Sequence, residues 1–151
     1  MSTTADQIEI QKLSQRYADG VMSRDVDVWS STWAEDGVWY LGTPDPIEGR
    51  ETIKQVWLGA MGGYPVVLHI VQPGVIDVDG DTATARFYIH ESIIDAEDNR
   101  VWNFGVYNDT LKKEGGEWKF ASRRFNSMYR GPVDLSGSLD GFKAYTEGAS
   151  V

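Results

Sequence analysis

The pattern of apolar and polar positions is clearest in the middle of the chain, between Val66 and Ile94. The first half of this stretch is rich in β-branched apolar residues, and the second half alternates between apolar and polar residues. Asp79-Gly80-Asp81 separates the two halves, and an Asp-Gly pair tolerates the positive φ that hairpin turns require. The stretch therefore predicts two antiparallel strands joined by a tight turn. The apolar face of the second strand consists of Ala83, Ala85, Phe87 and Ile89.

Helical spacing is seen before this hairpin. Apolar residues recur three or four positions apart up to about Met22, which predicts a first helix ending there. Asp25 or Asp27 can then cap a second, short helix that holds Trp29 and Trp33 four residues apart. For Asp25, this structural role as a helix cap is the preferred interpretation.

The remaining elements complete an α+β order. A third helix is predicted over Gly49–Met61 and a short strand over Gly37–Leu41. Two long strands are expected over Val101–Lys113 and Trp118–Met128, separated by a Gly-Gly turn. Helices that precede a strongly twisted antiparallel sheet are typical of the α+β class.

Length and composition indicate one domain spanning residues 1–151. Its core is expected at about residues 5–130, and residues 131–151 form a Gly- and Ser-rich arm that can pack on a neighbouring subunit. Six Trp, seven Tyr and five Phe are many for this length, so aromatic surface must be buried in a core, a pocket or an interface.

Charge and cysteine content exclude several classes of function. The net charge of −9 argues against nucleic acid and anionic membranes as partners. We find neither a transmembrane run nor a signal peptide, and we expect a cytoplasmic protein. Without cysteine there is no thiolate metal site, and the two histidines lack carboxylates at ligand spacing, so no metal is expected.

His69 and Glu91 interrupt the apolar pattern of the hairpin. His69 lies within a run of aliphatic residues, and Glu91 has the parity of Phe87 and Ile89. A carboxylate on an apolar sheet face is costly unless it is paired, hydrogen-bonded or protonated. The two side chains could form an acid/base pair in a dry pocket. Otherwise His69 is a satisfied core histidine, and Glu91 pairs with an arginine. The candidate arginines are Arg86, Arg100 and Arg123.

Four stretches together resemble the SnoaL-like branch of the nuclear-transport-factor-2-like superfamily. They are RYADGVMSRDVDVW, EGRETI, LHIVQPGVIDVDGDTATARFY and GVYNDTLKKEGGEWKFASRRF, within roughly Ile8–Tyr129. The resemblance implies a cone-shaped, curved antiparallel or mixed sheet wrapped by three N-terminal helices around an apolar pocket. It also implies a homodimer or homotrimer. Relatives include scytalone dehydratase, bile-acid 7α-dehydratase, hexachlorocyclohexane dehydrochlorinase, polyketide cyclases and dioxygenase β-subunits.

The resemblance also implies a site. The family's dehydratases pair a sheet histidine with an aspartate late in the first helix and use no cofactor. His69 matches that histidine, Glu91 an acidic position, and Tyr17 and Tyr40 two pocket tyrosines. The sequence departs from the family at Met22, which occupies the position of the aspartate. Glu91 could then partner His69 or act as the base itself; alternatively, the elimination chemistry has been lost or replaced.

The sequence-based hypothesis is a cofactor-independent lyase. It would break a C–O or C–C bond of a small, largely apolar, aromatic or polycyclic hydroxylated substrate, with His69, Glu91, Tyr17 and Tyr40 as catalytic residues. Both tyrosines could instead be core aromatics. The alternatives are a non-catalytic ligand-binding protein like the dioxygenase β-subunits, which Met22 favours, and an isomerase or cyclase. The expected substrate-binding residues are Arg123, Met22, Trp29, Trp57, Asn103 and Tyr107.

Overall fold

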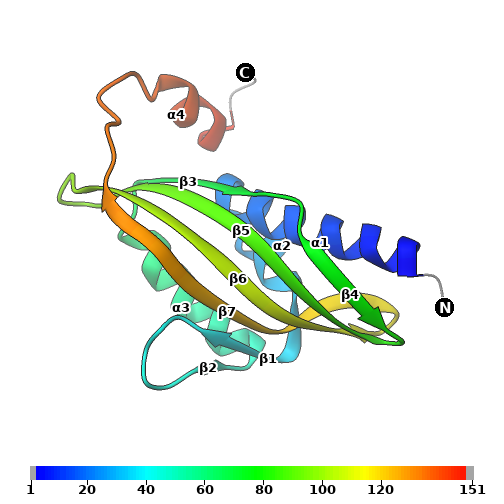
Figure 1. The fold of residues 1–151 in the computed structure, drawn as a ribbon. Helices are drawn as coiled ribbons and strands as arrows, with labels where there is room; N and C mark the ends of the chain where they lie inside the picture. The colour runs from blue at the N-terminus through cyan, green and yellow to red at the C-terminus, as the bar shows by residue number, and fades with distance from the viewer. Residues whose placement is uncertain (1–2, 149–151) are drawn as a thin grey trace.

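The computed structural model describes residues 3–148, which form four helices and a curved, seven-stranded mixed sheet (Figure 1). The α+β class is confirmed. Helices α1, α2 and α3 lie against the inner face of the sheet, and the long strands β5, β6 and β7 curve around them. The helices are α1 (Thr3–Ser23), α2 (Val26–Ser31), α3 (Arg50–Gly62) and α4 (Asp140–Thr146). The strands are β1 (Trp33–Tyr40), β2 (Ile47–Glu48), β3 (Val66–Val71), β4 (Val75–Asp79), β5 (Thr82–Ile94), β6 (Arg100–Glu114) and β7 (Glu117–Pro132).

The predicted hairpin has a broken first arm. The strand order is β2-β1-β7-β6-β5-β3, and β4 also pairs with β5, so β3 and β4 lie one after the other along the same partner. The break falls at Pro73 and Gly74. Proline has no N–H for the ladder, and a Cβ at Gly74 would lie 2.4 Å from the Phe87 ring. The side chain of Gln11 bonds both backbone groups of Gly74 instead.

Two other elements correct the sequence prediction. Trp33 begins β1 and does not continue α2, because the helix ends at Ser31 and Trp33 pairs with Phe120 on β7. The Asp25 carboxylate caps α2, accepting hydrogen bonds from two backbone N–H groups.

The C-terminal arm contains a short helix, α4, that approaches α1 (Figure 1). Its packing on another subunit, and the homodimer or homotrimer, stay predictions.

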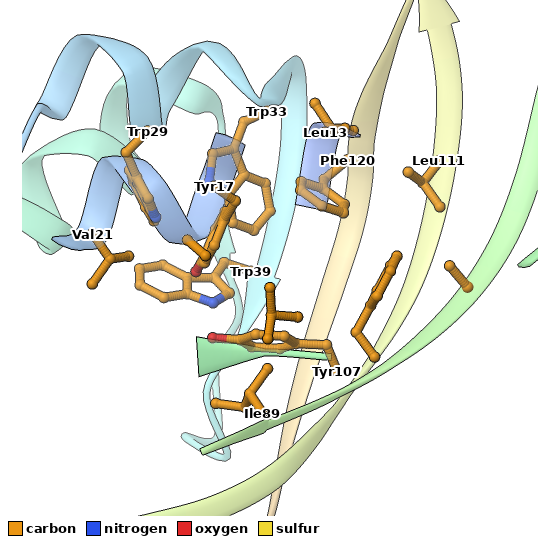
Figure 2. Packing of buried hydrophobic residues seen from close by; sticks show 14 of the residues in the cluster. Leu13, Tyr17, Val21, Trp29, Trp33, Trp39, Ile89, Tyr107, Leu111 and Phe120 are labelled. Atoms are coloured by element: carbon orange, nitrogen blue, oxygen red, sulfur yellow. The ribbon is translucent and has the colours of Figure 1, made fainter. Parts of the chain in front are cut away.

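Aromatic residues fill the space between helices and sheet. Figure 2 shows the Tyr17 ring of α1 among the indoles of Trp29, Trp33 and Trp39, with Tyr107 of β6 below it. The Trp29 and Trp57 rings stack with their centroids 4.8 Å apart. The inner face of β5 is buried with the alternation that the sequence predicts. No helix within residues 3–148 combines the length and the apolar character needed to cross a membrane.

A close approach at Gly105 shapes the inner face of the sheet. A Cβ there would lie 2.4 Å from Cε2 of Phe125 and 2.7 Å from the backbone oxygen of Asn126. We expect Gly105→Ala to lower the free energy of unfolding by about 1–3 kcal/mol, measured by urea denaturation, because the Phe125 ring must move. Gly59→Ala is the control, since the described residues leave open space around it in α3, and it should be neutral or slightly stabilising. Equal stability of the two variants would contradict the expectation.

Candidate active site

His69 and Glu91 meet on neighbouring strands. They are direct partners in the register of β3 and β5, so their side chains leave the same face of the sheet. Nδ1 of His69 lies 2.8 Å from Oε2 of Glu91. The His69 side chain is only 1% exposed and that of Glu91 19% exposed. The pairing of β3 with β5 therefore brings His69 and Glu91 together. The partner of the Glu91 carboxylate is His69 and not one of the candidate arginines.

The environment of His69 leaves one ring nitrogen free. With Nδ1–H donating to the carboxylate, Nε2 carries a lone pair. Among the described residues, Nε2 has no hydrogen-bond partner although it is buried. A buried, unpaired acceptor is costly in an apolar surrounding, so it has to be explained by structure or by function.

A cavity of about 330 Å³ lies beside the pair. Its polar lining includes a row of four residues in register across four strands, namely His69 on β3, Glu91 on β5, Asn103 on β6 and Arg130 on β7. Asn103 accepts a hydrogen bond from Ser127. The apolar part of the lining comes from α1, β1, α3 and the sheet, and includes Val21, Trp39, Trp57, Ala60, Met61, Val67, Ile93 and Phe125. An apolar cavity with a few converging polar groups suits a small organic ligand.

Two tyrosines form the innermost part of this cavity. The Tyr17 and Tyr107 rings have centroids 5.9 Å apart, and each lies about as close to the His69 ring, at 6.0 Å and 6.3 Å. Their hydroxyl groups interact. Burial raises the pKa of both hydroxyls, although the Arg123 charge partly opposes it for Tyr17. Both tyrosines therefore remain proton donors at neutral pH.

These raised pKa values make a prediction for alkaline stability. The unfolded tyrosine loses its proton near its ordinary pKa of 10.0, before the folded one does. The stabilisation is therefore complete below pH 10 and is lost as the pH rises toward the folded-state pKa, by up to about 1.4 kcal/mol per pH unit for each tyrosine. In urea unfolding at increasing alkaline pH, the free energy of unfolding should fall less steeply with pH in Tyr107→Phe than in the wild type. The exposed-site control Tyr145→Phe should keep the wild-type slope; a wild-type slope in Tyr107→Phe as well would contradict the expectation.

Arg123 lies beneath the tyrosines and is not part of the cavity lining. Its guanidinium donates to both carboxylate oxygens of Asp109, at 2.9 Å and 2.8 Å, and neither side chain is exposed. The guanidinium carbon lies 3.9 Å from the Tyr107 ring centroid and 4.4 Å from that of Tyr17. The expected substrate-binding arginine is thus placed where it supports the tyrosines from below.

The other expected residues fall into two groups. Trp57, Asn103 and Tyr107 line the cavity, whereas Trp29 is fully buried behind Trp57. Met22 does not line the cavity, but its sulfur accepts the backbone N–H of His69 at 3.1 Å. Met22, which the sequence resemblance matches with an aspartate, therefore contacts the backbone of the histidine.

Tyr40 is not brought to the cavity. It follows Trp39 on β1, and successive side chains of a strand point to opposite faces, so Trp39 lines the cavity while Tyr40 lies on the outer face. There Arg124 lies 4.0 Å above its ring. The expectation that Tyr40 shares a site with His69 is corrected by this strand parity.

Sequence reasoning missed two residues. Arg130 lines the cavity and Asp109 pairs with Arg123, yet neither was singled out. What identifies them is the register of β6 and β7 in the folded sheet, which pairs Asn103 with Arg130 and Asp109 with Arg123. Within residues 3–148, no cluster of three or more His, Asp and Glu side chains is placed to hold a metal ion.

Comparison with known families identifies the fold's relatives. The sequence matches the model of the SnoaL-like domain over residues 2–124. The chain belongs to the SnoaL-like family. An uncharacterized protein of Mycobacterium tuberculosis, Rv2910c, is 27% identical over 122 residues, which are 79% of this chain and 83% of that protein.

Solved structures with the same fold include two proteins named for elimination chemistry. A proposed scytalone dehydratase from Novosphingobium aromaticivorans has a TM-score of 0.78 at 18% identity, covering 87% of this chain and 89% of that protein. The hexachlorocyclohexane dehydrochlorinase LinA-type3 from Novosphingobium barchaimii has a TM-score of 0.77 at 19% identity, covering 87% and 92%. At these identities the likeness concerns the fold alone.

Proposed function

We propose that this SnoaL-like protein is a cofactor-independent lyase that acts on a small, largely apolar, hydroxylated aromatic or polycyclic compound. The observation that carries the proposal is the 2.8 Å contact between His69 Nδ1 and Glu91 Oε2, with Nε2 buried and unpaired among the described residues and with His69 lining an aromatic-walled cavity. A histidine oriented by a carboxylate is a typical general base. The names of the structural neighbours are consistent with elimination chemistry on this fold.

The chemistry can take two forms. In a dehydration, Nε2 of His69 removes a proton from carbon, the C–H electrons form the double bond, and the C–O bond breaks. The departing oxygen accepts hydrogen bonds from Tyr17 and Tyr107 and leaves as water with the proton that His69 took. In a retro-aldol cleavage, His69 removes the hydroxyl proton, the C–C bond breaks to give an aldehyde, and an electron-withdrawing group on the substrate holds the resulting carbanion until it is protonated.

The experiment is a ligand screen followed by product analysis. Trp39 and Trp57 line the cavity, so quenching of tryptophan fluorescence reports binding of hydroxylated aromatic and polycyclic compounds. Binders are then incubated with the wild type and with His69→Gln, and the products are separated by mass spectrometry. The proposal predicts His69-dependent loss of water or of an aldehyde from at least one binder. Binding without any His69-dependent product would contradict it.

Met22 favours a second candidate, a non-catalytic ligand-binding protein. Its thioether contacts the backbone of His69 and cannot accept a proton from the imidazole as an aspartate could. In that case the cavity binds aromatic ligands and His69→Gln changes affinity alone. An isomerase or cyclase needs the same base and differs in the fate of the carbanion, which product analysis separates.

A further inference from the structure

Arg130 is a cation at the edge of the cavity that has no counterion among residues 3–148. It lies on the exposed end of β7, in register with Asn103, and contributes to the cavity lining. Arg50, Arg100 and Arg123 each pair with a carboxylate, whereas no ion pair to Arg16, Arg24, Arg86, Arg124 or Arg130 is found within residues 3–148. Of these unpaired arginines, Arg130 is the one that lines the cavity.

Glu91 and Arg130, the two charged residues of the cavity lining, are separated along the row of cavity residues that crosses the sheet. Glu91 pairs with His69 at one end, Arg130 lies two strands away, and the neutral Asn103 stands between them. Adjacent strands are about 4.8 Å apart, so the backbones at Glu91 and Arg130 are separated by roughly 10 Å and those at His69 and Arg130 by roughly 14 Å. The described residues show no ion pair between Glu91 and Arg130, and the Glu91 charge disfavours an anion near the histidine.

We infer that the cavity selects an elongated ligand with an apolar, aromatic body and a carboxylate at one end, and that Arg130 is the specificity-determining residue that binds the carboxylate. The apolar walls contact the body of the ligand, and the guanidinium matches the planar, bidentate geometry of a carboxylate. Repulsion from Glu91 and attraction to Arg130 then orient the ligand, with the end remote from the carboxylate toward Nε2 of His69. The orientation toward His69 rests on the proposed function; the carboxylate preference does not.

A matched pair of probes tests this inference by binding alone. Biphenyl-4-carboxylate and biphenyl-4-carboxamide have nearly the same shape, and their affinities can be measured by fluorescence quenching and isothermal titration calorimetry. In the wild type, the carboxylate should bind about three- to tenfold more tightly than the amide, and added salt should reduce the difference. Arg130→Gln should abolish the preference while the amide affinity stays unchanged.

Arg124→Gln is the matched control, because Arg124 is an arginine of the same strand that lies on the outer face above Tyr40. It should keep the wild-type preference. Equal affinities in the wild type, an unchanged preference in Arg130→Gln, or failure of both probes to bind would overturn the inference. An Arg130-dependent preference without any turnover would support it while counting against the lyase. His69-dependent turnover of neutral compounds without a carboxylate preference would support the lyase and contradict the role of Arg130.

Discussion

The His69→Gln variant is expected to have a kcat/KM at least about 100-fold below that of the wild type, because a positioned general base contributes roughly 10²–10⁴ in rate. Glutamine has a side chain of similar length and can keep a hydrogen bond to Glu91, but it cannot accept the substrate proton at neutral pH. The assay is steady-state turnover of a compound found by the ligand screen, with circular dichroism and a urea unfolding curve to check that the fold is kept.

His90→Gln is the matched control for this variant. His90 is the other histidine of the chain, and it precedes Glu91 on β5, so its side chain leaves the opposite face of the sheet. It should retain wild-type turnover. Glu91→Gln should lower the rate as well, because the carboxylate orients the imidazole and stabilises the imidazolium that forms. Equal losses in His69→Gln and His90→Gln would point to a general effect on the sheet and would contradict a specific base.

The largest effect on stability is expected from breaking the Asp109–Arg123 pair. Both side chains are inaccessible to solvent, and burial raises the pKa of the Asp109 carboxyl, although Arg123 opposes this shift. Asp109→Ala leaves a buried guanidinium without its counterion, which typically costs about 3–5 kcal/mol. That is a large part of the roughly 5–15 kcal/mol that holds a domain folded. The measurement is urea denaturation followed by tryptophan fluorescence.

An exposed pair provides the comparison. Lys112 contacts Asp36 at 2.6 Å on the surface, and Asp36→Ala should leave the free energy of unfolding almost unchanged, because solvent screens an exposed ion pair. The double variant Asp109→Leu/Arg123→Met should be more stable than Asp109→Ala, because replacing both ions leaves no buried charge unpaired. A small effect of Asp109→Ala, similar to that of Asp36→Ala, would show that water or another group already compensates the pair.

The two strands of the hairpin show how much of the site can be predicted from sequence. Alternation along β5 is a local property, and it placed Glu91 on the inner face correctly. Its contact with His69 depends on the β3–β5 register, and the break after β3 hides that register from a local pattern. The sequence therefore supports the His69–Glu91 pair only as a hypothesis, whereas the structure gives the contact between the two side chains.

The residues that the sequence prediction placed wrongly or did not single out also have physical explanations. Trp33 follows Trp29 at helical spacing, yet pairing with β7 overrides this weak local preference. Tyr40 matched a family position, but its neighbour Trp39 takes the inward direction on β1. Asp109 and Arg130 acquire their significance from partners on the adjacent strand, so only the β6–β7 register assigns them.

A role of His69 as the base requires that the proton of its ring lie on Nδ1, between the ring and Glu91. Two-bond ¹H–¹⁵N correlation spectra of the imidazoles, recorded where the ring is neutral, report which nitrogen carries it, and His90→Gln assigns the two histidines. We predict a protonated Nδ1 and an unprotonated Nε2 for His69, with that preference lost in Glu91→Ala. A protonated Nε2 in the wild type, or a His69 spectrum unaffected by Glu91→Ala, would contradict the account.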